Sequence, residues 1–325
     1  ITADSAAMGS LLIPSMKKAG YDADYAVAVT ATSGTIGALI PPSILMVLYG
    51  SLTNLSVGQL FLGGIIPGLL FGVVLMVVAY ILGRVRGYDF RVSDFQTPSD
   101  QPYWKELLYA FRGASIALII PLVIVGGIVG GFATPTEAGV IAVACAMVAG
   151  LFFYRTLNWS SIYETAYRTA VLTAVVMAII AFSTLFSDIL TRNNFQSWLL
   201  GTIGFISDDR YVHLVLILLM LFVLGFVLDV TAMLIMFAAP LAAIGMTLGF
   251  DPIHYGVIIV MVSLLGACTP PVGTLLLISC TIARIPLSKA MGTVFWFVGA
   301  QLLVSAFLIF VPETITWIPS LVFGR

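Results

Sequence analysis

The feature that most restricts this chain is a series of apolar runs, each long enough to cross a membrane. A helix needs about 20 apolar residues to span a bilayer. Runs of this kind occupy residues 58–83, 113–131, 137–154, 169–190 and 290–311. Overall the chain is 60% hydrophobic and 9% charged, whereas soluble domains carry about 25% charged residues. We therefore expect an all-α polytopic membrane protein.

The composition also excludes several classes of function. No basic stripe is present that could neutralise phosphates, so we expect no nucleic-acid partner. The cysteines, Cys145, Cys268 and Cys280, lie in apolar runs, which indicates helix-packing residues rather than a disulfide framework. His213 and His254 lie far apart and do not indicate a metal centre. Without a Walker motif, ATP is not the expected direct source of energy.

Basic residues orient the predicted spans. The polar stretch after residue 83 carries Arg84, Arg86, Arg91, Lys105 and Arg112. The positive-inside rule places this stretch in the cytoplasm. Counting onward, the basic loops at 155–168 and 284–289 reach the same side only if residues 211–246 enter and leave the membrane on its outer side. We therefore predict a re-entrant hairpin at 211–246; a single long tilted helix is the alternative.

Two further apolar runs, 25–50 and 253–283, are each broken by a pair of prolines. The breaks read GALIPP at 37–42 and GACTPP at 266–271. Proline inside a helix removes a backbone hydrogen bond and clashes with the preceding turn. One kink of this type is compatible with a purely structural role, but the repetition indicates related segments.

The matches upstream of the two breaks predict an internal repeat. Gly-Tyr-Asp at 20–22 and Gly-Phe-Asp at 249–251 stand at the same spacing as the breaks. Asp4 and Asp229 each begin a short predicted helix that contains a proline. By the charge count, the two units enter from opposite sides of the membrane, as in inverted-repeat transporters.

Unwound backbone at membrane depth is tolerated where it is buried in protein or lines a polar cavity. Its carbonyl groups can coordinate a cation, and the N-termini of half-helices favour anions. We therefore predict two cation sites flanking an anionic substrate. Asp4 and Asp229 are functional candidates because charged residues at membrane depth are costly. Alternatively, each only caps a helix N-terminus.

Several stretches together resemble the large membrane (M) subunit of tripartite ATP-independent periplasmic (TRAP) transporters. They are ADSAAMGSLLIPSMKKAGY, GALIPPS, GGFATPTEAG and LDVTAMLIMFAAPL followed by TPPVG. The resemblance covers essentially the whole chain. The family's motif includes a hairpin tip just before the first stretch, so we expect an N-terminal part of the first hairpin to be missing here.

The resemblance implies a multi-pass subunit of the bacterial inner membrane rather than an enzyme. It implies a small membrane (Q) subunit and a periplasmic substrate-binding protein as partners, in addition to the lipid bilayer. It further implies import of an organic acid, such as a C4-dicarboxylate or sialic acid. Transport in the family is sodium symport, with two or more sodium ions, by an elevator movement of two hairpins and two discontinuous helices.

The resemblance also implies site residues. Sodium ligands at the first break are expected from Thr32, Ser33, Gly34, Gly37 and Pro41, mostly through backbone carbonyls. At the second break they are expected from Val230, Ser263, Gly266, Thr269 and Pro270. Residues expected near the substrate are Asp229, Ser43, Thr231 and Thr274. Asp4 is a further candidate for ion coupling.

The expected organisation has four parts. Residues 1–50 carry the end of the first hairpin and the first broken helix, and 51–190 carry scaffold and connecting helices. Residues 191–283 carry the second hairpin and the second broken helix, and 284–325 carry the last helix and the C-terminus. Within these parts, we expect 191–210 to form a mixed connection.

Two local features complete the expectations. Thr134 and Glu137 stand at a predicted helix start, where they suit capping. The polar stretch at 158–168 suits an amphipathic arm on the inner membrane surface.

Three alternatives remain open. Another ion-coupled carboxylate transporter could share this inverted-repeat architecture. An intramembrane aspartyl protease would use Asp4 and Asp229 as a carboxylate dyad, although no Gly-x-Gly-Asp motif accompanies them. A channel could line its pore with the same breaks, but hairpins that open to opposite sides favour alternating access.

Overall fold

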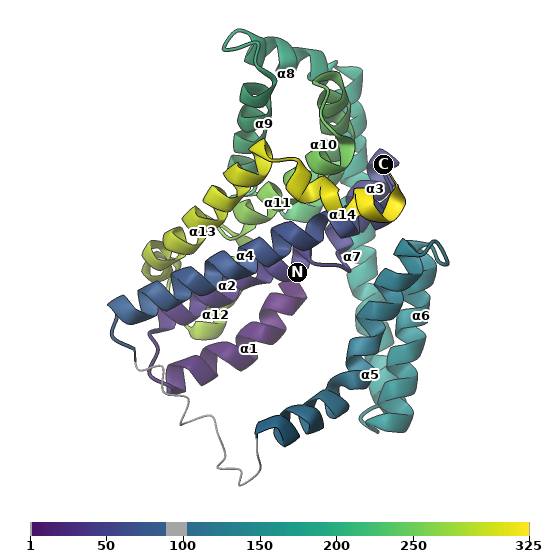
Figure 1. The fold of residues 1–325 in the computed structure, drawn as a ribbon, viewed down its shortest axis with the longest axis vertical. Coiled ribbons are helices and arrows are strands. Elements are labelled where there is room, and N and C mark those ends of the chain that lie inside the picture. The colour runs from purple at the N-terminus through teal and green to yellow at the C-terminus, as the bar shows by residue number, and fades with distance from the viewer. Residues whose placement is uncertain (1, 89–102, 325) are drawn as a thin grey trace. The chain divides into compact units, whose positions relative to one another are not determined.

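A computed structural model describes residues 2–88 and 103–324, and the regular structure of this part is entirely helical (Figure 1). The chain divides into two compact units, Ile1–Tyr88 with Ile180–Arg325, and Asp89–Ile179. The helices of the first unit are α1 (Thr2–Lys18), α2 (Ala23–Leu39), α3 (Ile44–Thr53), α4 (Val57–Val85), α8 (Phe195–Gly204), α9 (Arg210–Leu224), α10 (Val230–Thr247), α11 (Pro252–Ala267), α12 (Thr274–Ala283), α13 (Leu287–Phe310) and α14 (Glu313–Phe323). The second unit contains α5 (Tyr103–Val129), α6 (Pro135–Val148) and the π-helical turn η2 (Ala149–Phe153). Helix α7 (Trp159–Arg192) contributes to both units.

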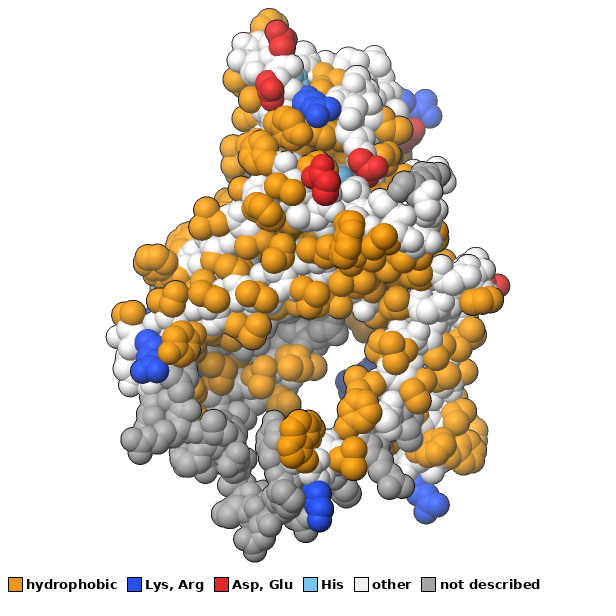
Figure 2. All heavy atoms as spheres, viewed as in Figure 1, with side chains coloured by type: hydrophobic (Ala, Val, Ile, Leu, Met, Phe, Trp, Pro, Cys, Tyr) orange, Lys and Arg blue, Asp and Glu red, His pale blue; other side chains and the backbone are white. Residues whose placement is uncertain are grey.

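The helices carry the signature of a membrane protein, as the sequence predicted. In the described part, α4, α7, α10, α13, and α6 with η2 are long and apolar enough to cross a bilayer. Helices α2 and α3 together form a broken span bent by 45°. Large apolar side chains such as Met76 of α4 and Leu303 of α13 are exposed, and Figure 2 shows hydrophobic side chains covering the visible face over these helices. Surfaces of this kind suit contact with lipid.

The two helices that precede the breaks form the core of the first unit. Helix α2 packs against α1, α4, α12 and α13, whereas α11 packs against α4, α9, α10 and α13. Every residue of α11 from Ile253 to Ala267 is buried, as expected of a helix that is apolar on all sides. Helix α4 therefore packs with the broken helices in this unit.

The repeated segments share local structure. Gly20 and Gly249 have φ angles of +87° and +72°, a left-handed conformation that glycine adopts without a steric penalty. The aspartates that follow, Asp22 and Asp251, are the N-cap residues of α2 and α11. Both Pro–Pro peptide bonds, at Pro41–Pro42 and Pro270–Pro271, are cis.

The structure confirms that 211–246 contains a hairpin rather than one long helix. Helices α9 and α10 are separated by a tip at residues 225–229, and in Figure 1 both extend from the region of α8. The rings of Tyr211, in the first turn of α9, and Phe250, just after α10, lie 5.6 Å apart. The chain therefore enters and leaves the hairpin at the same end.

In the second unit, α5 packs against α6. The predicted cap at Thr134 is confirmed as a capping box: Thr134 Oγ1 accepts from the Glu137 N–H at 3.3 Å, and Glu137 Oε2 accepts from the Thr134 N–H at 2.8 Å. These bonds satisfy backbone donors that a helix start otherwise leaves unpaired.

Three expectations about helix limits were incomplete or wrong. The segment predicted at 113–131 belongs to the longer α5, which begins at Tyr103. The predicted connection at 191–210 contains the helix α8. The stretch at 158–168 is not a separate arm, because α7 runs without a break from Trp159 to Arg192. Polar side chains along the first turns do not separate them from the rest of a helix whose backbone hydrogen bonds continue.

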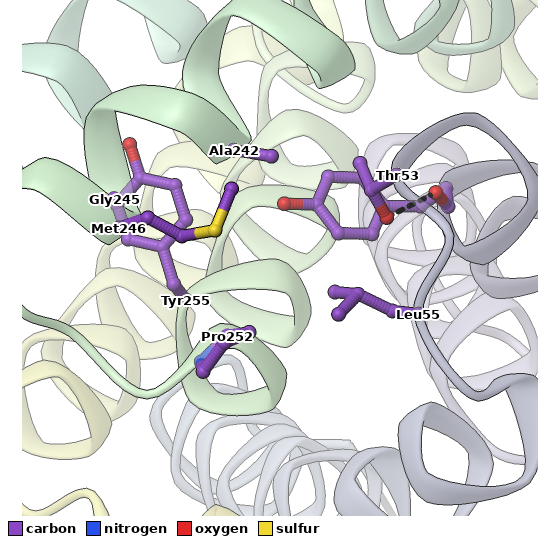
Figure 3. Close-up of a pocket in the computed structure, with 8 residues that line it drawn as sticks. Thr53, Leu55, Ala242, Gly245, Met246, Pro252 and Tyr255 are labelled. Carbon is purple, nitrogen blue, oxygen red and sulfur yellow. Dashed lines mark hydrogen bonds between the residues drawn. The ribbon is translucent and has the colours of Figure 1, made fainter.

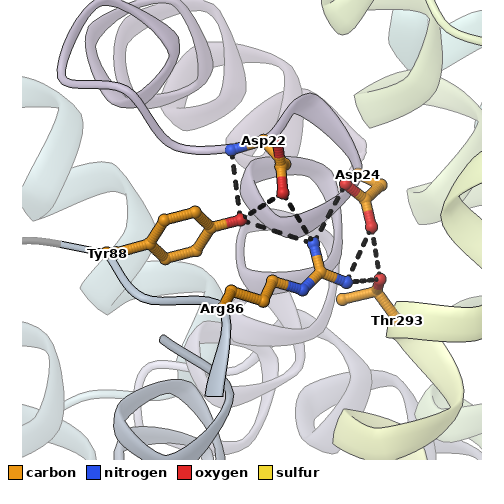
Figure 4. Close-up of polar contacts among 5 residues, drawn as sticks. All are labelled: Asp22, Asp24, Arg86, Tyr88 and Thr293. Atoms are coloured by element: carbon orange, nitrogen blue, oxygen red, sulfur yellow. Dashed lines mark hydrogen bonds and ion pairs between the residues drawn. The ribbon is translucent and has the colours of Figure 1, made fainter. Parts of the chain in front are cut away.

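A polar cluster connects the start of α2 with the C-terminal end of α4 and the N-terminal part of α13 (Figure 4). Arg86 donates to both carboxylate oxygens of Asp24, at 3.1 and 2.9 Å, and to Asp22 at 3.4 Å. Tyr88 donates to Asp22 at 2.7 Å, and Thr293 of α13 donates to Asp24. The hydrogen bond with Asp24 raises the pKa of Arg86, which therefore stays charged. The Asp24 side chain is only 15% exposed, so its charge depends on these partners.

We expect Arg86→Ala to lower the free energy of unfolding by about 1.5–3 kcal/mol, because it leaves the half-buried Asp24 carboxylate without its charged partner. Equilibrium unfolding in mixed micelles measures the loss. Arg84→Ala is the matched control, since Arg84 lies at the same helix end and its guanidinium donates to the Tyr80 hydroxyl at the exposed surface. Equal losses for both variants would contradict a specific role for the cluster.

Candidate functional site

At the first break, one buried hydroxyl joins the two half-helices. Helix α2 ends at Leu39 and α3 begins at Ile44. Ser43 is 2% exposed; its Oγ donates to the Ala38 carbonyl and accepts from the Met46 N–H at 3.3 Å. Ser43, which we expected near the substrate, is therefore the N-cap of α3 and lies in the unwound segment.

At the second break, the hairpin tip rests directly on the unwound segment. The Gly273 N–H donates to the carbonyl of Phe226 in the tip, at 3.3 Å. Gly225 of the tip and Gly266 of α11 are in backbone contact, because a Cβ atom built on Gly266 would lie 2.7 Å from the Gly225 Cα. Neither glycine has room for a side chain, so this contact determines how closely the tip approaches the break.

A related contact lies before the first break. Ser5 of α1 is 2% exposed, and its Oγ would lie 2.7 Å from a Cβ built on Gly34 of α2. The two repeats therefore share a contact. In the first, Ser5 packs against Gly34 of α2, and in the second, Gly225 packs against Gly266 of α11.

The break chemistry suits a hard cation held by neutral oxygens. The last carbonyl groups of a helix have no partner within it, and they form the negative end of its dipole. Ser263 Oγ and Ser5 Oγ are buried and have no hydrogen-bond partner in the described part of the chain. The same part contains no group of three or more His, Cys, Asp or Glu side chains that could hold a metal. Carbonyl and hydroxyl oxygens are ligands that hard cations prefer.

The predicted ligands differ in burial between the two breaks. At the second break all five are buried, namely Val230, Ser263, Gly266, Thr269 and Pro270. At the first break Thr32 is buried, Ser33, Gly34 and Pro41 are half-buried, and Gly37 is exposed. A Cβ built on Gly37 would meet no atom of the described residues within 4 Å.

Three of the predicted hydroxyl ligands donate to backbone carbonyls three or four residues earlier in the chain. Thr32 Oγ1 donates to the Ala28 carbonyl at 2.7 Å, and Ser33 Oγ donates to Thr30 at 3.0 Å. Thr269 Oγ1 donates similarly at 2.7 Å, to the carbonyl one turn earlier. In each case the hydroxyl uses its proton and keeps its oxygen lone pairs, so the oxygen can still accept. Ser263 Oγ has no hydrogen-bond partner among the described residues.

Asp229 caps helix α10. Its Oδ1 accepts from the Thr231 N–H at 2.9 Å. The capping role that the sequence left open for Asp229 is therefore present, and it is compatible with a further role for the charge. Thr274 is the first residue of α12. Asp4 lies in the first turn of α1, and its side chain is outside the described residues.

The middle of α2 is in contact with the second break and with α13. Cys268, directly after α11, donates through its Sγ to the Ala31 carbonyl at 3.4 Å. On the other side, Gln301 of α13 donates to Thr35 Oγ1 at 2.7 Å. Sequence reasoning did not select Ser5, Cys268 or Gln301 for the site. Gln301 could have been found, since a polar residue inside an apolar span is a functional candidate.

The first unit also contains a pocket away from the predicted site residues (Figure 3). It is lined by Tyr49, Thr53, Leu55, Ala242, Gly245, Met246, Pro252 and Tyr255. Glycines make room for its tyrosines, because a Cβ built on Gly256 would lie 2.5 Å from the Tyr49 ring and one on Gly245 would lie 2.7 Å from the Tyr255 ring. None of the residues expected to bind sodium or substrate lines this pocket.

Comparison with known proteins identifies the family. The family model described as "Tripartite ATP-independent periplasmic transporter, DctM component" matches residues 1–314. The chain belongs to this family. It is thus the large permease subunit of a TRAP transporter, and a multi-pass membrane protein, as the resemblance implied.

Relatives within the DctM family support this assignment. The chain is 32% identical to the C4-dicarboxylate TRAP transporter large permease protein DctM of Vibrio cholerae, over 98% of its own length and 73% of that protein. It is 34% identical to the sialic acid TRAP transporter large permease protein SiaM of the same organism, over 99% and 74%. The isethionate TRAP transporter permease protein DctMQ of Oleidesulfovibrio alaskensis is 32% identical over 94% of the chain, which spans only 47% of that longer protein. These relatives are transporter permeases, and none is named as a protease.

We expect Gly225→Ala and Gly266→Ala each to destabilise this DctM-family subunit by about 1–3 kcal/mol, because the added methyl group meets backbone atoms that cannot move independently. Equilibrium unfolding in mixed micelles measures both. Gly292→Ala in α13 is the control, as a Cβ there would meet no atom within 4 Å. Wild-type stability in both glycine variants would refute the tight contact between tip and break.

Proposed function

We propose that this subunit imports a small organic acid by sodium symport, using the two breaks as its cation sites. The observation that best supports this is the second break, where the hairpin tip packs against Gly266 of α11 and the buried Ser263 Oγ, one turn earlier in α11, has no hydrogen-bond partner among the described residues. Buried oxygens without hydrogen-bond donors are unfavourable unless another group, such as a cation, approaches them. The inverted repeat provides a second site of the same type at the first break.

The substrate residues support an anion as the transported molecule. Ser43 is the N-cap of α3, Thr274 begins α12, and Thr231 lies in the first turn of α10. Helix N-termini present backbone N–H groups and the positive end of the helix dipole, both of which favour carboxylates. A C4-dicarboxylate or sialic acid fits this chemistry, and the two Vibrio cholerae relatives carry these substrates in their names.

The assembly that we propose contains a small membrane (Q) subunit and a periplasmic substrate-binding protein, in the bacterial inner membrane. The family description names a periplasmic, ATP-independent system of three parts, and the relative named DctMQ supports the association of the two membrane subunits. The binding protein would deliver the acid to the outer side.

An elevator movement is the proposed mechanism. Hairpins and broken helices that pack as one body can carry a bound substrate across the membrane between two positions. Helix α4, which we expected in the scaffold, packs against α2, α13 and α14. We now propose that α4 moves with the broken helices.

The test is uptake into proteoliposomes that contain the complete transporter and its binding protein. We expect saturable uptake of the organic acid under an inward sodium gradient, and none when potassium replaces sodium. Uptake without sodium would overturn the sodium sites. An ohmic current that grows with voltage and does not saturate with substrate would favour a channel.

Two substitutions at Asp229 separate its charge from its role as a helix cap. Asparagine keeps an N-cap acceptor, whereas alanine removes it at a cost of about 1 kcal/mol. If the charge supports the cation site, both Asp229→Asn and Asp229→Ala lose sodium-driven uptake, but only the alanine variant loses that stability. Normal uptake by Asp229→Asn would restrict Asp229 to capping.

A further inference from the structure

Helix α13 carries one amide side chain in the middle of an apolar, membrane-spanning sequence. Gln301 is fully buried, at 0% exposure, and Ala300 and Leu302 flank it. Polar side chains are costly at membrane depth, and those that occur there usually have a functional partner. Packing alone would be served as well by leucine or methionine.

The donor side of Gln301 contacts α2 just before the first break. Its Nε2 donates to Thr35 Oγ1 at 2.7 Å and approaches the Thr32 carbonyl at 3.5 Å. Thr35 Oγ1 in turn donates to the same Thr32 carbonyl at 2.7 Å. The amide therefore ends a short chain of hydrogen bonds, which fixes the rotation of α2 one turn before it ends at Leu39.

The acceptor side of Gln301 has a different environment. Its Oε1 is buried and has no hydrogen-bond partner among the described residues. A buried acceptor in this condition keeps its partial negative charge unscreened in a medium of low dielectric constant. It thus contributes to the negative potential near the helix end, which already favours a cation.

A second contact holds Ala31, the residue that precedes Thr32 in α2. The Ala31 carbonyl accepts from Cys268 at the other break, at 3.4 Å. Neighbouring carbonyls of α2, those of Ala31 and Thr32, are thus held from two different elements. Because a helix is rigid over a few turns, these contacts determine where the carbonyls of the following residues, including Gly37, point.

We propose that Gln301 is a positioning residue for the first cation site. Its amide nitrogen fixes the last turns of α2 through Thr35, and its amide oxygen adds negative potential beside them. The inference rests on the proposed sodium symport. It assigns part of the sodium affinity to α13, which carries none of the residues expected to bind sodium.

The test uses Gln301→Leu, which keeps the volume of the side chain and removes both polar ends. Thr35→Val removes the same hydrogen bond from the side of α2, and the double variant completes a mutant cycle. Ser305→Ala is the control, because it removes another buried hydroxyl of α13, one that donates only to the Gln301 carbonyl of its own helix.

Two readouts are needed, on the complete transporter. The first is thermal unfolding, measured while sodium replaces choline at constant ionic strength. Its result is the sodium concentration at which the unfolding midpoint has risen by half of its maximal increase. The second is the sodium concentration for half-maximal uptake. We expect Gln301→Leu to raise both by about tenfold or more, as removal of a group that orients metal ligands does. Thr35→Val should raise them in the same direction, and the double variant should be no worse than Gln301→Leu.

The outcomes separate this inference from the proposed function. If wild-type protein shows neither sodium-specific stabilisation nor sodium-driven uptake, the proposed function fails. If the wild type responds to sodium and Gln301→Leu keeps the same half-saturating concentration, only the role of Gln301 fails. Strictly additive effects in the cycle would also overturn it. If Gln301→Leu does not fold, Thr35→Val alone decides, since an unchanged sodium response there refutes the hydrogen-bonded chain.

Discussion

A backbone that leaves its helix inside a membrane must find its hydrogen-bond partners in the protein, because lipid offers none. The structure of the first unit depends on this constraint. At the second break the partner is the hairpin tip, whose Phe226 carbonyl accepts from Gly273. At the first it is Ser43, whose hydroxyl bonds to both half-helices. Ser263 Oγ, which is buried and has no hydrogen-bond partner among the described residues, is an exception to this pairing.

The glycines follow from the same constraint. A tip can donate or accept backbone hydrogen bonds only if the two backbones come close, and a side chain at Gly225 or Gly266 would keep them apart. Membrane helices use small residues for close approach in general. Here, the close approach of Gly225 and Gly266 brings the hairpin tip against the second break.

Local patterns in the sequence predicted much of this architecture. Paired prolines mark both breaks, the distribution of basic residues requires the hairpin at 211–246, and Thr134 with Glu137 marks a helix start; each of these signals acts over a few residues. The contacts of Ser5 and Gln301 could not be predicted in this way, because their partners lie on other helices. Likewise, the sequence could not show that Thr32 and Ser33 bond within α2, since a hydroxyl's partner depends on the rotamer. The roles of the predicted ligands stay predictions.

The hydrogen bonds to α2 also have a consequence for biosynthesis. Ala31 and Thr35 obtain partners from Cys268 and Gln301, which follow 237 and 266 residues later. At about 5–20 residues per second, the ribosome needs tens of seconds to reach them. During that time, α2 is already synthesised, but the Ala31 carbonyl and the Thr35 hydroxyl lack their final partners. The first repeat can therefore complete its fold only after most of the chain has emerged, which makes α2 a candidate client for chaperones of membrane insertion.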